Sequence, residues 1–192
     1  VKYFIITKVA FSTDTSITVY GGTDYTLAGG AITLPYYSTS KSPQGFPLDP
    51  SKWTVLVTDT SQRQQGTPGS GTWYNISQGN ITLPIGVWAV DYQVIASATD
   101  TSGTLIGQYV TLSTANNNTS DSGFTSFGYV KAGGNGANIM GVYATLIRSK
   151  YLTITTKTPY YLNVMIDAAN IEELNIRGDL GTTTVRAICA YL

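Results

Sequence analysis

The chain has no histidine, one cysteine and few charged residues, and each scarcity excludes a class of function. Without histidine, Ser–His–Asp triads, Cys–His dyads and histidine-ligated metal sites are excluded, and a single cysteine cannot build a zinc cluster. Cys189 lies in the apolar run VRAICAYL, where we expect it to be a small buried hydrophobic side chain. The sequence therefore predicts neither a metal nor another cofactor.

Charged residues make up only 11% of the 192 residues, and 11 Lys and Arg balance 11 Asp and Glu. Nucleic-acid binding needs clustered cations to neutralise phosphates, and the chain has no basic run, so no nucleic-acid partner is expected. No stretch of 18 apolar residues is present, so no membrane insertion is expected either. The surface is expected to consist mostly of Thr, Ser, Asn, Gln and Tyr, which is typical of an extracellular or particle-bound protein.

The segment over residues 80–98 organises the rest of the chain. The segment reads NITLPIGVWAVDYQVIASA. A short strand is expected at Ile81–Leu83, and Pro84 and Gly86 then lead into a long run of alternating residues. Its alternate positions form one apolar face, because side chains in a strand point to opposite sides with period two. That face consists of Trp88, Val90, Tyr92, Val94 and Ala96. The run predicts the central strand of an antiparallel sandwich.

Further strands are expected on both sides of this segment, separated by Gly, Asn, Asp and Ser clusters. Residues 168–174 (AANIEEL) predict a loop or a single helical turn. With short turns and no convincing helix, the pattern is typical of an all-β sandwich or barrel. The strands expected after residue 72 cover about 73–76, 81–83, 86–98, 104–112, 125–131, 138–148, 151–157, 159–166 and 182–191.

The chain divides into two expected domains. Residues 1–60 predict a small N-terminal β domain, which we expect to be incomplete at its start because Val1 already lies in a strand pattern. Residues 61–72 (SQRQQGTPGSGT) have no periodicity and read as a linker. Residues 73–192 then form the second domain.

The N-terminal third carries a distinctive run, YGGTDYTLAGGAITLPYYSTSKSPQGFPLDPSKWTVLVTDTS, preceded by VKYFIITKV. This run resembles a segment that recurs in structural proteins of tailed bacteriophages and prophages, mostly of Gram-positive hosts. The resemblance implies a virion component and carries no catalytic residues.

The second domain resembles the jelly roll of C1q-like and tumour-necrosis-factor-like trimers. The shared features are the LPIGVW lead into a long strand, the run YLTITTKTPYYLNVMI, which reads as a hairpin, and an apolar final strand. The resemblance implies a homotrimer built from an antiparallel jelly-roll β-sandwich.

Two of the expected strands are apolar on both faces. This pattern argues for oligomerisation independently of the two family resemblances. In a two-layer sandwich one face of each strand is normally wet, so a second apolar face needs another burial surface. Closed homo-oligomeric symmetry supplies one, and a larger monomeric core is the alternative. The residues assigned to this interface are Tyr143, Ile147, Ile188, Ala190 and Leu192.

Polar and aromatic residues in the longest loops form a candidate saccharide surface. Sugars stack on aromatic rings, and amides and carboxylates bind their hydroxyls. The candidate contacts are Asn116, Asn117, Asn118, Asp121, Tyr129, Asn135 and Asn138. Hydrophilic loops without a ligand are an equally good explanation.

A second candidate is the acidic group Asp167, Glu172, Glu173 and Asp179, which could serve glycoside hydrolysis or calcium binding if the carboxylates were paired. A solvated loop explains it more simply. The tripeptide Arg177-Gly178-Asp179, which integrins recognise, is attributed to chance, with Gly178 required by a turn.

The sequence therefore predicts a non-enzymatic phage virion protein on the tail or capsid surface. The main hypothesis is a tail-fibre or receptor-binding module that contacts a host-cell glycan and binds other virion proteins through its N-terminal domain. The alternative is a capsid decoration or head-fibre protein. A glycan-degrading tailspike is a third hypothesis, which no paired-acid motif supports.

Overall fold

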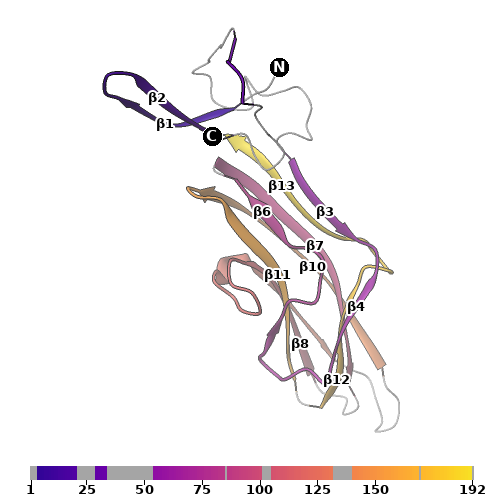
Figure 1. The fold of residues 1–192 in the computed structure, drawn as a ribbon. Helices are drawn as coiled ribbons and strands as arrows, with labels where there is room; N and C mark the ends of the chain where they lie inside the picture. Colours follow the sequence, from indigo (N-terminus) through magenta and orange to yellow (C-terminus); the bar gives the residue numbers. More distant parts are fainter. Residues whose placement is uncertain are drawn as a thin grey trace.

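The computed structural model describes residues 4–20, 29–33, 54–84, 86–100, 105–131, 140–168 and 170–191. Within these ranges the regular structure consists of strands and one short 3₁₀ turn, η2 (Ser122–Phe124). β1 (Ile5–Phe11) and β2 (Thr15–Tyr20) pair only with each other and form a hairpin outside the sandwich (Figure 1). The remaining strands form two antiparallel sheets.

The first sheet is built around a long pair of strands, β7 (Gly86–Asp100) and β10 (Met140–Ile154), which are in register from Gly86 opposite Ile154 to Asp100 opposite Met140. The other edge of β7 is shared by two strands that follow each other in the chain, β12 (Ile171–Arg177) and β13 (Thr183–Tyr191). β13 in turn pairs with β3 (Thr54–Asp59), and β12 pairs with β4 (Gln62–Gly66). β12–β13 and β3–β4 are thus two long rows, each with one break.

The second sheet is centred on β11 (Thr158–Asp167) and β8 (Leu105–Ser113), which pair with each other. β9 (Thr125–Lys131) lies on the outer edge of β8. β5 (Trp73–Tyr74) and β6 (Ile81–Leu83) share the outer edge of β11 and make another interrupted row.

When each interrupted row counts once, the sandwich has eight rows in chain order. With the rows numbered 1 to 8 along the chain, neighbouring rows in the first sheet are 1-8-3-6, and neighbouring rows in the second sheet are 2-7-4-5. Apart from the fourth and fifth rows, which are neighbours in the second sheet, sequential rows alternate between the sheets, in the order of a double-sheet jelly roll. This confirms the predicted fold class, an all-β antiparallel jelly-roll sandwich.

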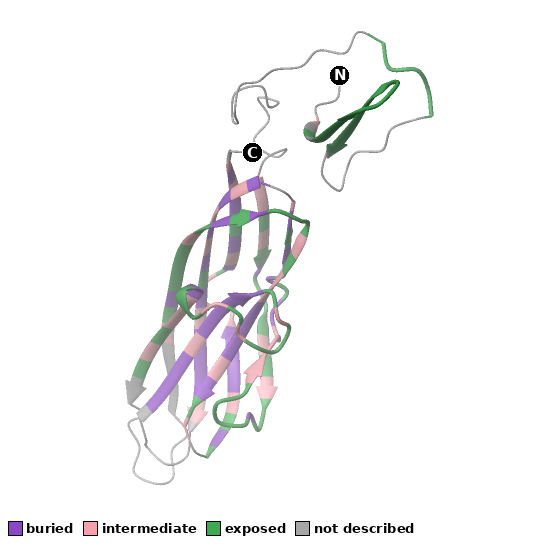
Figure 2. Cartoon of the chain, turned by 90° about the vertical axis from the view of Figure 1, so that its left-hand side faces the viewer, coloured by how far each residue is buried: buried purple, intermediate pink, exposed green. Residues whose placement is uncertain are grey.

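The core lies between the two sheets, where Figure 2 shows the buried residues concentrated. The predicted apolar face of β7 is confirmed, because all five of its side chains are at most 3% exposed. Alternate residues of the second sheet close the core from the other side, including Ile106, Val110, Leu162 and Val164. The single cysteine, Cys189, is buried in this core as predicted.

The hydroxyl of Tyr92 joins the two sheets by hydrogen bonds. Tyr92 lies on β7 and is fully buried, and its hydroxyl proton faces the carbonyls of Val110 (2.8 Å) and Phe124 (3.0 Å). The same oxygen accepts a hydrogen bond from the backbone N–H of Ser126 at 3.0 Å. Burial is the main reason that the pKa of Tyr92 lies above its usual range. The side chain stays neutral and fixes β7 against the β8–β9 edge.

The breaks in the two interrupted rows of the first sheet, β3–β4 and β12–β13, lie side by side. Gly178, just after β12, is buried against the β3–β4 junction, where a Cβ would lie 2.4 Å from the carbonyl oxygen of Asp59 and 2.6 Å from that of Ser61. The carboxylate of Asp59 closes the junction by accepting hydrogen bonds from the Ser61 N–H (3.0 Å) and the Arg63 Nε (2.8 Å). The hydrogen bond from Arg63 is the main reason that the pKa of Asp59 is lowered.

The expected linker over residues 61–72 does not match the structure. Residues 62–66 form β4, paired with β12. The turn that follows is bonded to both sheets, through Thr67 N–H to the Glu172 carbonyl (2.7 Å) and Gly71 N–H to the Ile166 carbonyl (2.8 Å). Since β3 also pairs with β13, a domain boundary at 61–72 disagrees with this pairing.

Two other expectations are wrong. Residues 168–174 were expected to form a loop or a helical turn, but residues 171–174 belong to the strand β12 (Ile171–Arg177). The strands expected at 138–148 and 151–157 are one strand, β10, and the expected hairpin at 151–166 does not form, because β10 and β11 lie in different sheets.

We predict that Tyr92→Phe lowers the free energy of unfolding by about 1–3 kcal/mol, since it leaves a buried N–H and buried carbonyls without their partner. Urea denaturation measures the change. Tyr151→Phe, at a side chain that is 71% exposed, is the control and should stay within about 0.5 kcal/mol of wild type. Equal effects of the two variants would contradict a structural role for the Tyr92 hydroxyl.

We also predict that Gly178→Ala destabilises the fold by about 1–3 kcal/mol, because the new methyl group would overlap backbone oxygens that have little room to move. Gly66→Ala is the matched control, since a Cβ at Gly66 meets nothing within 4 Å. Thermal unfolding of both variants tests this, and a Gly178→Ala melting temperature equal to that of the control would disprove the tight contact.

Candidate functional site

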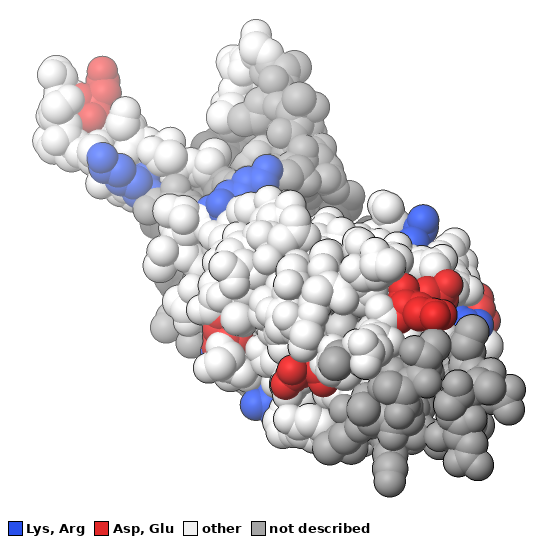
Figure 3. All heavy atoms as spheres, turned by 90° about the horizontal axis from the view of Figure 1, so that it is seen from below, with Lys and Arg blue, Asp and Glu red and all other residues white. Residues whose placement is uncertain are grey.

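The charged residues are dispersed rather than gathered into a catalytic group. On the face shown in Figure 3, acidic and basic side chains lie in several small groups, some of them side by side, with uncharged surface between the groups. Among the described residues, no three His, Cys, Asp or Glu side chains come together as a metal site requires. In the same part of the chain, no helix is long and apolar enough to cross a bilayer.

The acidic residues proposed for glycoside hydrolysis make separate contacts. Asp167 accepts a hydrogen bond from the Ser70 hydroxyl (3.2 Å), and Glu173 accepts one from Asn175 (3.4 Å). Asp179 is bound by Arg177, with Nε to Oδ1 at 2.8 Å and Nη2 to Oδ2 at 2.6 Å. This bond is the main cause of the lowered pKa of Asp179. The two charged side chains of the Arg-Gly-Asp tripeptide thus bind each other.

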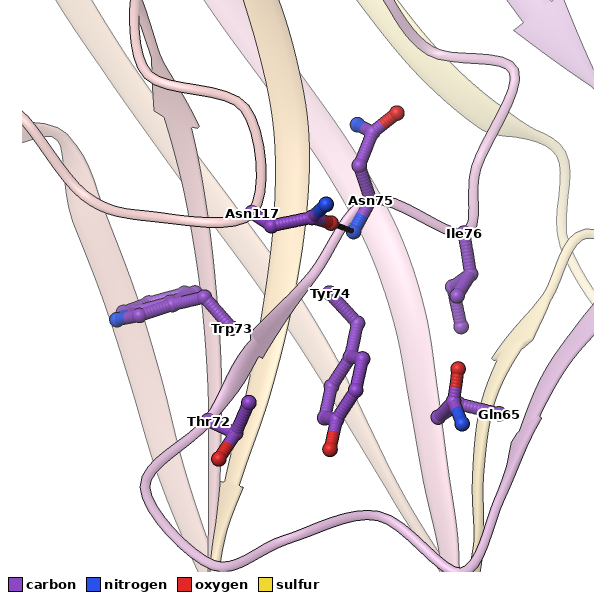
Figure 4. Close-up of a pocket in the computed structure, with 7 residues that line it drawn as sticks. All are labelled: Gln65, Thr72, Trp73, Tyr74, Asn75, Ile76 and Asn117. Atoms are coloured by element: carbon purple, nitrogen blue, oxygen red, sulfur yellow. Dashed lines mark hydrogen bonds between the residues drawn. The ribbon is translucent and has the colours of Figure 1, made fainter.

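A cavity of about 420 Å³ opens between the edge strands β4 and β5, where the two sheets separate. Tyr74 and Ile76 form its floor and pack against the core, and Figure 4 shows Trp73 pointing to the other side of β5 from Tyr74. The lining residues are Gln65, Thr72, Trp73, Tyr74, Asn75, Ile76 and Asn117.

The polar groups of this cavity are largely used within the protein. The Asn117 side-chain oxygen accepts a hydrogen bond from the Asn75 N–H at 2.6 Å (Figure 4). The Asn75 amide donates to Asn80 (2.9 Å) and to the Leu162 carbonyl (3.0 Å), and the Tyr74 hydroxyl accepts from the Gly69 N–H (2.8 Å). The arrangement holds the 114–121 loop onto β5 and offers no acid–base pair for chemistry.

The 114–121 loop folds back over the outer face of the second sheet. Asn163, fully buried on β11, donates its amide to the carbonyls of Ala115 (2.8 Å) and Asn118 (2.7 Å). The Ser113 hydroxyl accepts hydrogen bonds from the N–H groups of Ala115 and Ser120, both at 3.0 Å. The loop is therefore a fixed part of the surface.

The predicted saccharide contacts do not form one group. Asn116 and Asn118 are exposed on the 114–121 loop, whereas Asn117 lines the cavity. Tyr129 lies on β9 beside other aromatic residues rather than in a loop. Asn135 and Asn138 lie outside the described residues.

Asp121, another predicted contact, has a structural role at the opposite opening of the sandwich. One carboxylate oxygen accepts a hydrogen bond from the Gly123 N–H (2.9 Å) and caps η2, and the other pairs with Lys150 on β10. The bond with Lys150 is the main cause of the lowered pKa of Asp121. Arg148 Nε also donates to the Gly123 carbonyl (3.1 Å), so β10 holds η2 in place.

Two of the predicted interface residues lie on one surface, the outer face of the first sheet. Ile147 is 57% exposed on β10, and Ile188 is half-buried on β13. Alternation from the β7 core residues places both on the side that faces away from the core. Ala190 is half-buried further along β13, and the side chains of Tyr143 and Leu192 lie outside what the structure describes.

Tyr109 and Tyr129 form a hydrogen-bonded pair on the outer face of the second sheet, with hydroxyl oxygens 2.7 Å apart. This bond is the main reason that the pKa of Tyr109 is raised to about 12, and burial and the nearby Asp167 carboxylate also raise it.

Several surface residues on strands were not predicted as ligand contacts, because the predicted contacts lay in or beside loops. They are Trp73, Tyr109, Phe127 and Met165, and their signal was their alternation with buried neighbours on each strand. Their proximity depends on the strand order and register, which one sequence does not supply.

No family model and no curated protein matches the chain. Among solved structures, the Gt strain of infectious bursal disease virus aligns at 14% identity and a TM-score of 0.36, over 95% of this chain and 44% of the other. The Gx strain aligns at 13% and 0.33, over 72% and 38%. The T13 particle of the same virus aligns at 15% and 0.36, over 93% and 42%. The chain thus spans about two fifths of these chains, and the jelly-roll assignment depends on its own strand order.

We predict that a spectrophotometric titration shows a tyrosine ionising near pH 12 that Tyr109→Phe removes and Tyr129→Phe moves to lower pH. Because the folded pKa exceeds the unfolded value of about 10, the pair's contribution to stability is complete below pH 10 and is lost as the pH rises toward 12. The alkaline loss of stability should therefore be smaller in Tyr109→Phe. Identical titration curves for wild type and this variant would contradict the assignment.

Proposed function

We propose that the chain is a non-enzymatic structural component of a phage virion, displayed on the particle as a homotrimer that contacts the host surface. The observation that carries this proposal is the jelly-roll strand order, an architecture that viral capsid and lectin domains share. The phage-like run in the N-terminal third and the sparse charge support the same conclusion. The fold itself is compatible with many functions, and the surfaces of the sandwich distinguish among them.

The outer face of the first sheet is the surface proposed for self-association. Leu56, Ile147 and Tyr151 are each more than half exposed there, at 57%, 57% and 71%. A depression of about 200 Å³ lies beside Tyr151 and can receive a side chain of a second copy. An ion pair between Asp91 and Arg186 (3.0 Å) crosses the middle of this face. Exposed apolar residues gathered on one face suit self-association with closed symmetry, and the charges of Asp91 and Arg186 neutralise each other within that face.

The N-terminal hairpin is proposed to contact other virion proteins. Val9, Phe11 and Ile17 are 60%, 79% and 54% exposed, and Figure 2 shows the described side chains of β1 and β2 as exposed. An isolated two-stranded hairpin is marginally stable in water, so a partner that covers these side chains would stabilise it.

In this arrangement the second sheet faces away from the trimer axis, toward the host surface. Three copies of a weak glycan site act together, so avidity compensates for low affinity at each site. A tail-fibre or receptor-binding protein fits this role. On a capsid the same trimer would serve as a decoration or head-fibre protein.

We predict that light scattering gives the mass of a trimer and that Ile147→Lys shifts it toward the monomer, because a buried, unpaired cation is strongly unfavourable at an interface. Phe127→Lys is the matched control, since Phe127 is 62% exposed on the opposite sheet. A monomeric wild type, or equal dissociation by both variants, would remove the self-association proposal.

Labelling the protein on intact particles separates its two possible locations. Signal at the tail tip supports the receptor-binding role, and signal over the head supports decoration. A particle with no label at either place would overturn the virion assignment.

A further inference from the structure

Four apolar side chains form a continuous row across the outer face of the second sheet. Strand register places Trp73 opposite Met165, Met165 opposite Tyr109, and Tyr109 opposite Phe127. These four side chains extend across the full width of the sheet, a span of about 14 Å at the usual strand spacing. Tyr129 extends it along β9. We call Trp73, Met165, Tyr109, Phe127 and Tyr129 the aromatic band.

The rings of the band form a packed platform. Tyr109 and Phe127 are stacked with centroids 5.8 Å apart, and Tyr129 meets Phe127 (5.9 Å) and Tyr109 (6.3 Å) edge-on. The Tyr109 and Tyr129 rings lean over Gly107, where a Cβ would lie 2.9 Å and 3.1 Å from their atoms. A side chain larger than hydrogen at this position would push the rings away from the sheet. Despite this packing, Phe127 and Tyr129 remain 62% and 55% exposed.

Polar groups lie at one side of the band. The hydroxyls of Tyr109 and Tyr129 point toward each other, and the Asp167 carboxylate, held by the Ser70 hydroxyl at 3.2 Å, lies near them. Asp167 is the charged group among the outward side chains that the structure describes, and the next outward position after Tyr129 on β9 is Lys131, opposite Leu105. The surface thus combines ring faces with hydroxyl and carboxylate groups.

We infer that the aromatic band binds a neutral saccharide chain, with sugar rings stacked on Phe127, Tyr129 and Trp73 and sugar hydroxyls bonded to the tyrosine hydroxyls and Asp167. This inference rests on the proposed function and assigns its glycan site to the face of a sheet instead of the loops.

The charge and the size of the band favour this ligand over two others. A polyanion such as nucleic acid or a phosphate-containing wall polymer needs several clustered cations, whereas the outward strand positions of this face include one lysine, Lys131, and the Asp167 carboxylate. A stable protein partner needs about 800 Å² on each side. Phe127 and Tyr129 together expose roughly 200–300 Å², given about 150–250 Å² for each aromatic side chain. This area suits a short stretch of sugar rings.

Packing over Gly107 alone does not explain the band. A cross-strand aromatic residue commonly covers a glycine in a sheet, and Tyr129, directly opposite Gly107, does so here. Phe127 and Trp73 are not needed for that purpose. Their alignment with Met165 and Tyr109 therefore indicates a binding surface.

The test is titration of the full chain with neutral oligomers of glucose, galactose, rhamnose and N-acetylglucosamine, and with polyglycerol phosphate and hyaluronate as anionic probes, by calorimetry. We expect wild type to bind at least one neutral oligomer. Phe127→Ala and Tyr129→Ala should each weaken that binding roughly 3- to 10-fold. Leu180→Ala is the control, because Leu180 is a 56% exposed apolar side chain in the turn between β12 and β13, outside both the band and the proposed trimer face, and it should bind like wild type.

Gly107→Ala provides a second variant that keeps every aromatic group but displaces the Tyr109 and Tyr129 rings, so it should also lose affinity while its unfolding remains cooperative. Binding of no neutral oligomer, binding only of the anionic probes, or equal affinity of wild type and the band variants would overturn the inference. Light scattering and particle labelling of the same proteins distinguish the two proposals. A trimer on the particle that binds no saccharide refutes the band alone, whereas a protein absent from the particle refutes the proposed function.

Discussion

The buried hydroxyl of Tyr92 is the interaction on which the relative position of the two sheets depends. Hydrophobic packing between sheets is not directional, so by itself it permits small sliding movements. The three backbone groups that bond this hydroxyl lie on β8, β9 and η2, and all three bonds form at only one placement of β7. Because β7 is also the strand that β10, β12 and β13 share, the same contact fixes the whole first sheet against the β8–β9 edge.

The two outer faces of the sandwich differ in kind. The first sheet presents separate aliphatic side chains around the Asp91–Arg186 pair, together with a depression beside Tyr151. The second presents contiguous rings at one end and a fixed loop at the other. In a trimer that buries the first face, three copies of the second would be displayed outward. The two roles proposed for these faces follow from this difference, because a self-complementary surface and a ring platform suit different partners.

The sequence was informative where side-chain alternation reports burial. The β7 pattern predicted five core residues correctly, and most later strands lie within a few residues of their expected bounds. β4 was missed because it is an edge strand whose inward residues, Arg63 and Gln65, are only half-buried and polar. β12 was missed because a register shift between Ile171 and Glu173 interrupts its period of two. Of the aromatic band, only Tyr129 was predicted as a ligand contact, because the members come from distant positions and become neighbours only through strand register.

The low content of charged residues in this protein determines how its surface contacts respond to salt. Dissolved ions screen charge–charge attraction over a Debye length of about 10 Å at 0.1 M, so contacts built on ion pairs weaken as a medium becomes more saline. Contacts made by aromatic rings, aliphatic side chains and hydroxyl groups depend far less on this screening. A chain with equal numbers of acidic and basic residues also has no net charge to make neighbouring copies repel one another. Dense display of such a protein is therefore compatible with both dilute and saline surroundings.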